Sequence, residues 1–325
     1  MNTEKEERKI RFHSNGKLLL SGEYVVLHGA DSLVLPLKYG QDLSVCELKG
    51  GFQGILKWVA RENNEVWFTA LFDLISLQVI DSSNSLIADT LGRILKTVKK
   101  FKPNIFTSYE SLEISTNLEF NRNWGFGSSS TLLSNIARWA KTDPYKLNEA
   151  IAGGSGYDIA AAEISQPFIY NIYNKGRSTQ VNFNPPFKRY LYFVYLGEKQ
   201  DTFNDVKRYK DCANKPSKKL IKEVSDISNR LVNNKDLDEF EFLIEKHEKV
   251  IGDHIGKTPV KKLKFRDLEG TAKSLGSWGG DFIIMTFRKE RIHLKDYLKA
   301  KGLSTYFTYD ELILNTKTIK LFNEL

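Results

Sequence analysis

Apolar and polar positions alternate, cluster or repeat in ways that divide the first third of the chain into strands and one helix. Residues 10–47 contain a long apolar run between glycines, which indicates buried β structure with a tight connection. Residues 50–82 mix aromatic with polar positions and predict further strands of an antiparallel layer. Residues 84–101 repeat apolar side chains at helical spacing, and Pro103 ends that helix.

The remaining two thirds alternate between strand and helix patterns, so an α+β fold is expected. The predicted elements are a strand at 110–117, a helix at 128–141, a short helix opened by Asp143-Pro144, a strand at 189–196, two amphipathic helices within 216–255, a strand at 282–287 and, within 291–325, a helix followed by a strand. The Pro185-Pro186 pair is the best boundary signal in the chain. It divides the sequence into residues 1–186 and 187–325.

Composition favours a folded protein with an anionic partner. The 325 residues suit two domains or one large one, and 41% apolar residues can build a full core. The formal charge of +8 favours nucleotides, phosphorylated metabolites, nucleic acid or membrane surfaces without choosing among them. Aromatic residues are not interleaved with basic clusters, and Lys96, Lys99 and Lys100 gather at a helix end, where cations complement the helix dipole. We therefore expect no nucleic-acid partner.

Cysteine usage and hydropathy bear on location. Cys46 and Cys212 lie far apart without metal-ligand spacing, which favours a reducing cytoplasm over a disulfide framework or a zinc site. No run approaches the ~18–20 apolar residues that a membrane span needs. The charged segment from Met1 to Lys9 also lacks an apolar signal core. The sequence predicts a cytoplasmic protein with no membrane partner.

A glycine- and serine-rich stretch at residues 123–131 is the strongest chemical signal. Gly125 and Gly127 permit a tight turn, and the serines that follow, Ser128 to Ser130, suit a helix start because a serine at the N-cap accepts a backbone hydrogen bond. A glycine turn that leads into a helix offers free N–H groups to an anion, usually phosphate. The stretch matches neither the P-loop nor the dinucleotide fingerprint. Taken alone, it fits a serine-capped helix equally well.

Two further glycine stretches have both structural and functional interpretations. In residues 153–162, three glycines surround Ser155 and precede Asp158, which is either an N-cap or a carboxylate aimed into a cleft. Residues 272–281 form a glycine turn between a helix and a strand. Such a turn can hold a ligand against its backbone, or can be a hairpin or a helix stop.

Isolated polar residues within the apolar segments are best explained without a functional role. Lys17, Glu23 and His28 interrupt the apolar run of residues 16–29, and taken singly each is best explained as a solvated strand end. His247 and His254 lie on a predicted amphipathic helix without a companion cysteine or a convergent acid, so we expect both at the surface.

The glycine stretches, in this order and at these separations, resemble the motifs of the GHMP kinases, a superfamily that includes galactokinase, homoserine kinase, mevalonate kinase and phosphomevalonate kinase. The matching segments are Gly16-Lys17 through Gly22-Glu23-Tyr24, then Gly125-Phe126-Gly127-Ser128-Ser129-Ser130, then Ser155-Gly156-Tyr157-Asp158, and last Gly276-Ser277-Trp278-Gly279-Gly280. Any one motif is weak, whereas the ordered set spans residues 10–287 and is fairly specific.

The sequence also departs from the family pattern. Asn15 replaces the proline of the first motif, and the proline usually found upstream of the second motif is missing near Asn121. Trp278 stands where the third motif normally has a small residue. The first motif is similar to that of mevalonate and phosphomevalonate kinases, and Ser155 to Ala162 with Asp281 is more similar to phosphomevalonate kinase.

The resemblance implies a two-domain α+β fold. Residues 1–186 would form an ATP-binding domain like domain 2 of ribosomal protein S5, and residues 187–325 a ferredoxin-like domain. It also implies an ATP- and Mg²⁺-dependent kinase of the mevalonate (isoprenoid) pathway that acts on a small-molecule acceptor, with a homodimer left open. The alternatives are a homoserine or sugar acceptor, or a relative that binds nucleotide without catalysis.

The site residues that the resemblance implies fall into three groups. ATP phosphates would be bound by Gly125, Phe126, Gly127, Ser128, Ser129 and Ser130, with Ser129 and Glu149 as Mg²⁺ ligands. Asp158 would be the catalytic base, and Lys17 would hold it ionised, since a nearby cation lowers the pKa of a carboxylate. The acceptor would be bound by Glu23, Tyr24, Ser155, Gly156, Gly276, Ser277 and Gly279.

Overall fold

The structure, a computed structural model, describes residues 9–48, 53–174, 176–197, 209, 215–276, 278 and 281–315. The chain divides into two compact units. Unit 1 consists of Met1–Gly16, Tyr39–Arg122 and Gly127–Glu163, and unit 2 of Lys17–Lys38, Asn123–Phe126 and Ile164–Leu325. The boundary after Pro186 remains a prediction. Among the described helices, none is both long and apolar enough to cross a membrane.

Unit 1 is built on a mixed sheet in the order β5-β4-β3-β6-β2. Its strands are β3 (Ile55–Glu62), β4 (Glu65–Asp73), β5 (Val79–Ser82), β6 (Leu112–Leu118) and the second half of β2 (Ser32–Glu47), and β1 (Lys9–Leu19) also pairs with β2. The strands from β3 to β5 are antiparallel neighbours, which confirms the prediction for residues 50–82, whereas β3 and β6 are parallel.

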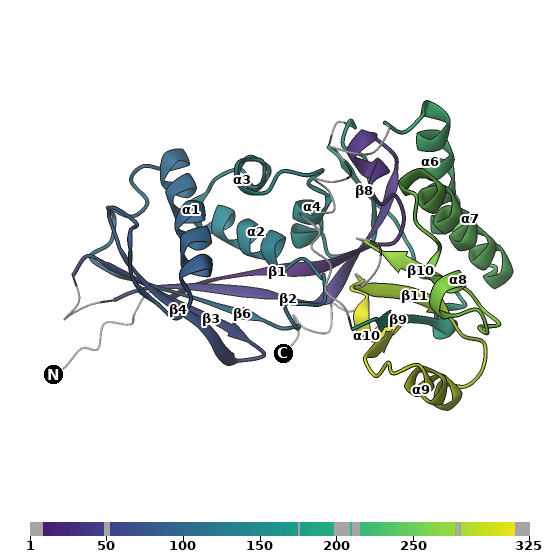
Figure 1. Ribbon diagram of the computed structural model, residues 1–325. Helices are drawn as coiled ribbons and strands as arrows, with labels where there is room; N and C mark the ends of the chain where they lie inside the picture. Colours follow the sequence, from purple (N-terminus) through teal and green to yellow (C-terminus); the bar gives the residue numbers. More distant parts are fainter. Residues whose placement is uncertain are drawn as a thin grey trace. The chain divides into compact units, whose positions relative to one another are not determined.

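Four helices of unit 1 lie on one face of this sheet (Figure 1). They are α1 (Ser85–Phe101), α2 (Ser128–Ala140), α3 (Pro144–Ile151) and α4 (Tyr157–Glu163). Their apolar residues and those of the strands form one core, in which Trp58, Phe72 and Ile136 are buried. Asn84 caps α1 and Asp143 caps α3 through side-chain hydrogen bonds, so these helices begin where the sequence pattern places them.

Buried polar groups fix α2 to the strands beneath it. The Asn135 amide donates to the Gln41 carbonyl oxygen (2.7 Å), and the Ser14 hydroxyl donates to Asn135 Oδ1 (2.8 Å). The Thr131 hydroxyl donates to Gln41 Oε1 (2.7 Å). Directional bonds of this kind specify the register of a helix on a sheet better than apolar contact alone does. The N-terminal half of α2 is therefore held in a defined position.

Unit 2 contains a four-stranded antiparallel sheet in the order β10-β11-β9-β12. The strands are β9 (Leu191–Tyr195), β10 (Ala272–Leu275), β11 (Phe282–Thr286) and β12 (Tyr306–Thr308), and η2 (Lys188–Tyr190) precedes β9. Ala272–Leu275 is a strand that pairs with β11, so the expectation that residues 272–281 form a turn between a helix and a strand is wrong for their first four residues. In the same unit, the first half of β2 pairs with β7 (Phe168–Tyr170), and β7 pairs with β8 (Ser178–Gln180).

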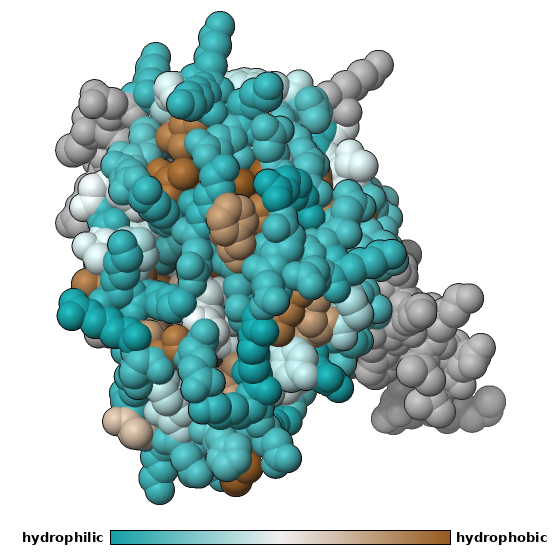
Figure 2. Space-filling model, turned by 90° about the vertical axis from the view of Figure 1, so that its right-hand side faces the viewer, coloured by the Kyte–Doolittle hydropathy of each residue, from teal (hydrophilic) through white to brown (hydrophobic). Residues whose placement is uncertain are grey.

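The helices of unit 2 include the two predicted amphipathic ones. They are η1 (Val25–His28), α6 (Lys218–Asn233), α7 (Leu237–Ile255), α8 (Val260–Lys264), α9 (Arg291–Ala300) and α10 (Tyr309–Leu312). Helices α8 and α9 share a core with the sheet, and α6 and α7 share another with η1. Helix α10, which the sequence pattern did not predict, begins at a capping box of Thr308 and Glu311. The face shown in Figure 2 is mostly hydrophilic, with scattered apolar side chains.

Candidate functional site

The glycine turn before α2 combines two left-handed glycines with a helix start that no side chain caps. Gly125 (φ 68°) and Gly127 (φ 93°) are both left-handed. Gly127 is the N-cap of α2, and no side chain caps the helix. The prediction that a serine caps it is therefore wrong, because all three serines lie inside the first turn. The first helical bond runs from Thr131 N–H to the Gly127 oxygen, so the N–H groups before it lie outside the helical ladder.

The serines of this turn differ in what their hydroxyl groups can do. The buried Ser130 hydroxyl donates to the Gly127 oxygen (2.8 Å) and supports the turn itself. Ser129 is exposed, and Ser128 is half-buried. Ser129 is thus the most exposed of the three serines, and it lies in the first turn of α2, at the positive end of the helix dipole.

In unit 2, Lys17 binds two carbonyl groups of the glycine turn. Its backbone N–H donates to the Phe126 oxygen (2.9 Å), and its ammonium donates to the Gly125 oxygen (3.1 Å). Lys17 is buried, so its interpretation as a solvated strand end is wrong. The Phe126 ring is fully buried and packs 4.6 Å from the ring of Phe282. Any contact of Phe126 with a nucleotide would therefore come from its backbone.

Gly125 is also required by its neighbour Asp281. A Cβ atom at position 125 would overlap the carboxylate of Asp281, which is itself buried. A side chain at position 125 would therefore require the Asp281 carboxylate, which lies just before β11, to move.

Asp158 lies in unit 1, in the first turn of α4, and α4 packs against α2 (Figure 1). It is half-buried, and its Oδ1 accepts a hydrogen bond from the N–H of Ile159 (3.1 Å). The helix begins at Tyr157, so Asp158 is not its N-cap. Ser155 and Gly156 are buried immediately before it, and Glu149 is exposed on α3. The structure thus brings the helix of the predicted base against the helix of the predicted phosphate turn.

A buried cluster of charges in unit 2 was missed by sequence reasoning. Glu23 and Lys273 form an ion pair, and Glu23 Oε2 lies 3.5 Å from Nε2 of His247. All three side chains are at most 1% exposed, so the surface prediction for His247 and the solvated interpretation of Glu23 are wrong. His254 is half-buried, with Nε2 3.0 Å from the Tyr209 hydroxyl. A signal for His247 existed, since it lies in register with the buried residues Phe240, Ile244 and Ile251 of α7.

The protonation of this cluster follows from its burial. The N–H of Gly22 donates to His247 Nε2 (2.9 Å), so the neutral imidazole carries its proton on Nδ1. Burial, followed by the charge of Lys273, lowers the pKa of His247 well below its usual value. Burial raises the pKa of Glu23 to about 7, although the bonded Lys273 ammonium acts in the opposite direction. Burial also raises the pKa of Glu248, which accepts bonds from the backbone and hydroxyl of Ser274.

Tyr24 connects the first motif to the third. It has a positive φ of 64°, which is uncommon outside glycine, and its hydroxyl accepts the backbone N–H of Trp278 (3.3 Å). Trp278 is 2% exposed and packs in one apolar cluster with Tyr24 and Tyr209. Gly276 has a left-handed φ of 70°. The predicted acceptor residues Ser277 and Gly279 lie outside the described residues.

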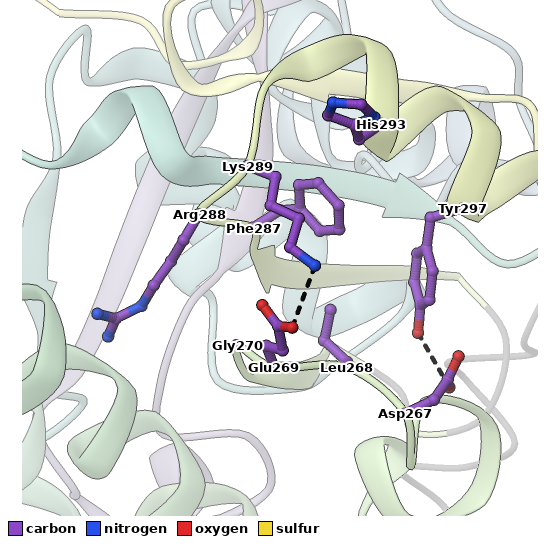
Figure 3. Close-up of a pocket in the computed structure, with 9 residues that line it drawn as sticks. All are labelled: Asp267, Leu268, Glu269, Gly270, Phe287, Arg288, Lys289, His293 and Tyr297. Atoms are coloured by element: carbon purple, nitrogen blue, oxygen red, sulfur yellow. Dashed lines mark hydrogen bonds and ion pairs between the residues drawn. The ribbon is translucent and has the colours of Figure 1, made fainter.

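Two other places were considered as ligand sites. A pocket of about 380 Å³ in unit 2 is lined by Asp267, Leu268, Glu269, Gly270, Phe287, Arg288, Lys289, His293 and Tyr297 (Figure 3). Its lining includes none of the predicted site residues, and Lys289 and Tyr297 are paired with the acids Glu269 and Asp267. In unit 1, ligand atoms of His13, Asp42 and Glu119 lie within 4.8 Å of one another. A His13–Asp42 ion pair (2.8 Å) accounts for the proximity of these two residues, so we assign no metal there.

The two-unit α+β fold agrees with the fold class that the motifs led us to expect, and it is similar to that of solved mevalonate kinases, phosphomevalonate kinase and galactokinase. The structure is similar to mevalonate kinase from Methanococcus jannaschii, with a TM-score of 0.65, 15% identity and coverage of 95% of this chain and 99% of that one. It is equally similar to Streptococcus pneumoniae phosphomevalonate kinase in complex with phosphomevalonate and AMPPNP (TM-score 0.65, 15% identity, coverage 92% and 99%). Lactococcus lactis galactokinase complexed with galactose is also similar, with a TM-score of 0.62, 12% identity and coverage of 95% of this chain and 94% of that one. No family model and no curated protein sequence matches the chain.

Gly125→Ala tests whether the turn needs glycine for space as well as for backbone conformation. Gly256 is the matched control, because its φ of 69° equals that of Gly125 within a degree while nothing lies within 4 Å of an added Cβ. We expect Gly256→Ala to cost about 1 kcal/mol of folding stability, the usual cost of a left-handed alanine. Gly125→Ala should cost more, since Asp281 must also move. Equal losses in urea unfolding would contradict the role of Asp281.

His247→Gln tests the neutral state of the buried imidazole. The unfolded chain binds a proton at His247 below pH ~6.5 whereas the native chain does not, so this group makes stability fall as pH drops below that value. Glu23 has the opposite effect, because its native pKa of about 7 lies above its unfolded pKa, so this group makes stability rise as pH falls between those two values. Between pH 7.5 and 5.5, the variant should therefore lose less stability than the wild type, by as much as about 1.4 kcal/mol. Parallel stability profiles would show that native His247 titrates normally.

Proposed function

We propose that this chain is an ATP-dependent kinase that transfers the γ-phosphoryl group to 5-phosphomevalonate or mevalonate. The observation that carries the proposal is the uncapped start of α2 behind two left-handed glycines, within a fold shared over nearly the whole chain with small-molecule kinases. N–H groups at a helix start, together with the helix dipole, favour the phosphates of a nucleotide. Phosphoryl transfer depends mainly on such positioning and charge stabilisation.

Magnesium fits the exposed oxygen donors of Ser129 on α2 and Glu149 on α3. The hydroxyl of Ser130 is used within the turn, whereas Ser129 exposes its hydroxyl and Glu149 exposes a carboxylate. Mg²⁺ prefers oxygen ligands and commonly takes only one or two from the protein. Ser129 and Glu149 would supply those oxygens, and the ion would neutralise phosphate charge.

Asp158 and Lys17 have complementary roles in this proposal. Asp158 would accept the proton of an attacking hydroxyl, or orient an attacking phosphate group. Lys17 would favour the ionised form of Asp158 and offset developing charge. The support for Asp158 is its place on α4, a helix that packs on α2 within unit 1.

The acceptor is proposed from two sources. The residue pattern of the first motif is similar to that of mevalonate and phosphomevalonate kinases, and the structures of kinases of both kinds are similar to this chain. The protein would then act in isoprenoid synthesis in the cytoplasm, on a small molecule rather than on nucleic acid. The galactokinase match keeps sugar acceptors among the outcomes of the test.

The first experiment is ADP release from Mg·ATP by the purified protein. Mevalonate, 5-phosphomevalonate, homoserine and galactose are offered separately. Turnover with one of the first two supports the proposal. Turnover with homoserine or galactose keeps the kinase and replaces the acceptor. Nucleotide binding without turnover on any of the four would support a relative that binds nucleotide without catalysis.

Asp158→Ala should lower turnover by at least ~100-fold, a typical contribution of a general base. ATP binding, measured by calorimetry, should persist because the α2 turn is untouched. Glu163→Ala is the control, since it removes an exposed carboxylate from the other end of the same helix. A folded Asp158→Ala protein with wild-type turnover would refute the assignment.

Ser129→Ala should raise the KM for Mg·ATP by about tenfold, the factor that a contact of about 1.4 kcal/mol supplies. The KM of the acceptor should change less. Ser85→Ala serves as control, because Ser85 is likewise an exposed serine in the first turn of a helix. Comparable changes in both KM values, or no change, would count against a metal ligand at Ser129.

A further inference from the structure

The buried Glu23–Lys273 pair joins two motifs that lie 250 residues apart in the chain. Glu23 belongs to the Gly22–Tyr24 turn of the first motif, and Lys273 lies on β10, the strand that enters the third glycine turn. The Lys273 ammonium donates both to Glu23 and to the Ser274 oxygen (2.7 Å). This side chain therefore ties the turn to the strand directly.

Helix α7 reaches both partners of this link with neighbouring residues. His247 accepts the N–H of Gly22, and Glu248 accepts the N–H of Ser274 (3.2 Å) and its hydroxyl (3.1 Å). Glu248 also accepts the N–H of Val260 (3.1 Å). The turn, the strand and the helix are thus held by hydrogen bonds between groups that are nearly inaccessible to solvent.

Such a cluster is poorly explained by stability alone. Burial of an ion pair removes both charges from water, and replacement by apolar side chains of similar volume is often neutral or stabilising. Two of its polar atoms, Glu23 Oε2 and His247 Nδ1, also lack a hydrogen-bond partner among the described residues. What directional bonds provide, and apolar packing does not, is a defined relative position of the joined segments.

We propose that Glu23, Lys273 and His247 are positioning residues that lock the first-motif turn to the strand of the third motif and thereby set acceptor affinity. The Tyr24 hydroxyl, which accepts the Trp278 N–H, carries the same link into the third glycine stretch. Glu23 itself is 1% exposed, so it acts through Lys273 and the backbone rather than by touching the acceptor. This inference rests on the proposed kinase function only for its kinetic consequence.

Three variants separate a role of the cluster in positioning the two segments from its effect on folding stability. Glu23→Gln leaves the Lys273 charge buried without its partner and should destabilise the protein. Adding Lys273→Met to it removes that charge and should recover much of the stability, yet the link stays broken. Glu245→Gln is the matched control, because Glu245 forms an exposed ion pair with Lys261 on the surface of α7.

The first readout is hydrogen exchange in peptides that cover residues 18–28 and 268–276, which needs no substrate. We expect faster exchange in Glu23→Gln and in the double variant, and wild-type exchange in Glu245→Gln. The second is steady-state kinetics, in which the acceptor KM should rise about tenfold, equivalent to about 1.4 kcal/mol, with kcat and ATP affinity nearly unchanged.

A double variant with wild-type exchange would overturn the proposal, since the pair would then only balance charge. A fall in kcat at constant KM would also overturn it, because Glu23 would act in the chemical step. His247→Leu and His247→Gln give an independent comparison. Glutamine can still accept the Gly22 N–H and should preserve slow exchange, whereas leucine should not. If no acceptor is turned over, the kinase proposal fails while the exchange measurements still decide this one.

Discussion

The candidate site depends on a backbone that must pass through two left-handed residues immediately before α2. At Gly125 the left-handed conformation is combined with a close approach of the Asp281 carboxylate, which a Cβ atom at this position would overlap. The Lys17 ammonium and backbone then bond the carbonyl groups of Gly125 and Phe126, which holds the turn in place. The first helical bond is made by the N–H of Thr131, so the N–H groups before it lie outside the helical ladder. The chemistry proposed for this turn rests on backbone groups, which is why its glycines matter more than its serines.

Unit 2 contains a group of ionisable side chains that are buried away from water. Glu23, Lys273, His247 and Glu248 are all nearly inaccessible, and the fold tolerates them because hydrogen bonds and one ion pair satisfy most of their polar atoms. His247 remains neutral because burial and a cationic neighbour both oppose its protonation. The cluster is a buried, hydrogen-bonded group of charged side chains that joins the Gly22–Tyr24 turn, β10 and α7.

Much of the fold follows from local pattern, and the parts that do not are tertiary. The periodicity of residues 84–101 and the continuous run of apolar and aromatic residues in 189–196 identified α1 and β9, because both signals depend only on which positions of an element are buried. The glycine turn was found from composition. Its cap was assigned wrongly, since serine and glycine both suit an N-cap and only the path of the chain decides between them.

Lys273 shows why the buried charge cluster was missed, although Glu23 itself was among the predicted acceptor residues. A lysine in a four-residue strand looks solvated unless its partner is known, and that partner lies at the other end of the sequence. His247 looked like a surface residue for the same reason, although its register on α7 with Ile244 and Ile251 placed it on the buried face. Site residues whose roles depend on a tertiary partner are those that local patterns describe least well.

The interleaving of the two units along the chain has a consequence for synthesis. Lys17–Lys38 and Asn123–Phe126 belong to unit 2, but most of that unit is encoded after residue 163. On a ribosome that adds ~5–20 residues per second, Glu23 would wait on the order of 12–50 s before Lys273 is made. During that interval the apolar segment Leu18–Leu20 has no completed unit to enter. Unit 2 can therefore be completed only after Lys273 and the strands around it have been made, and until then its early segment lacks the residues that bury it in the finished unit.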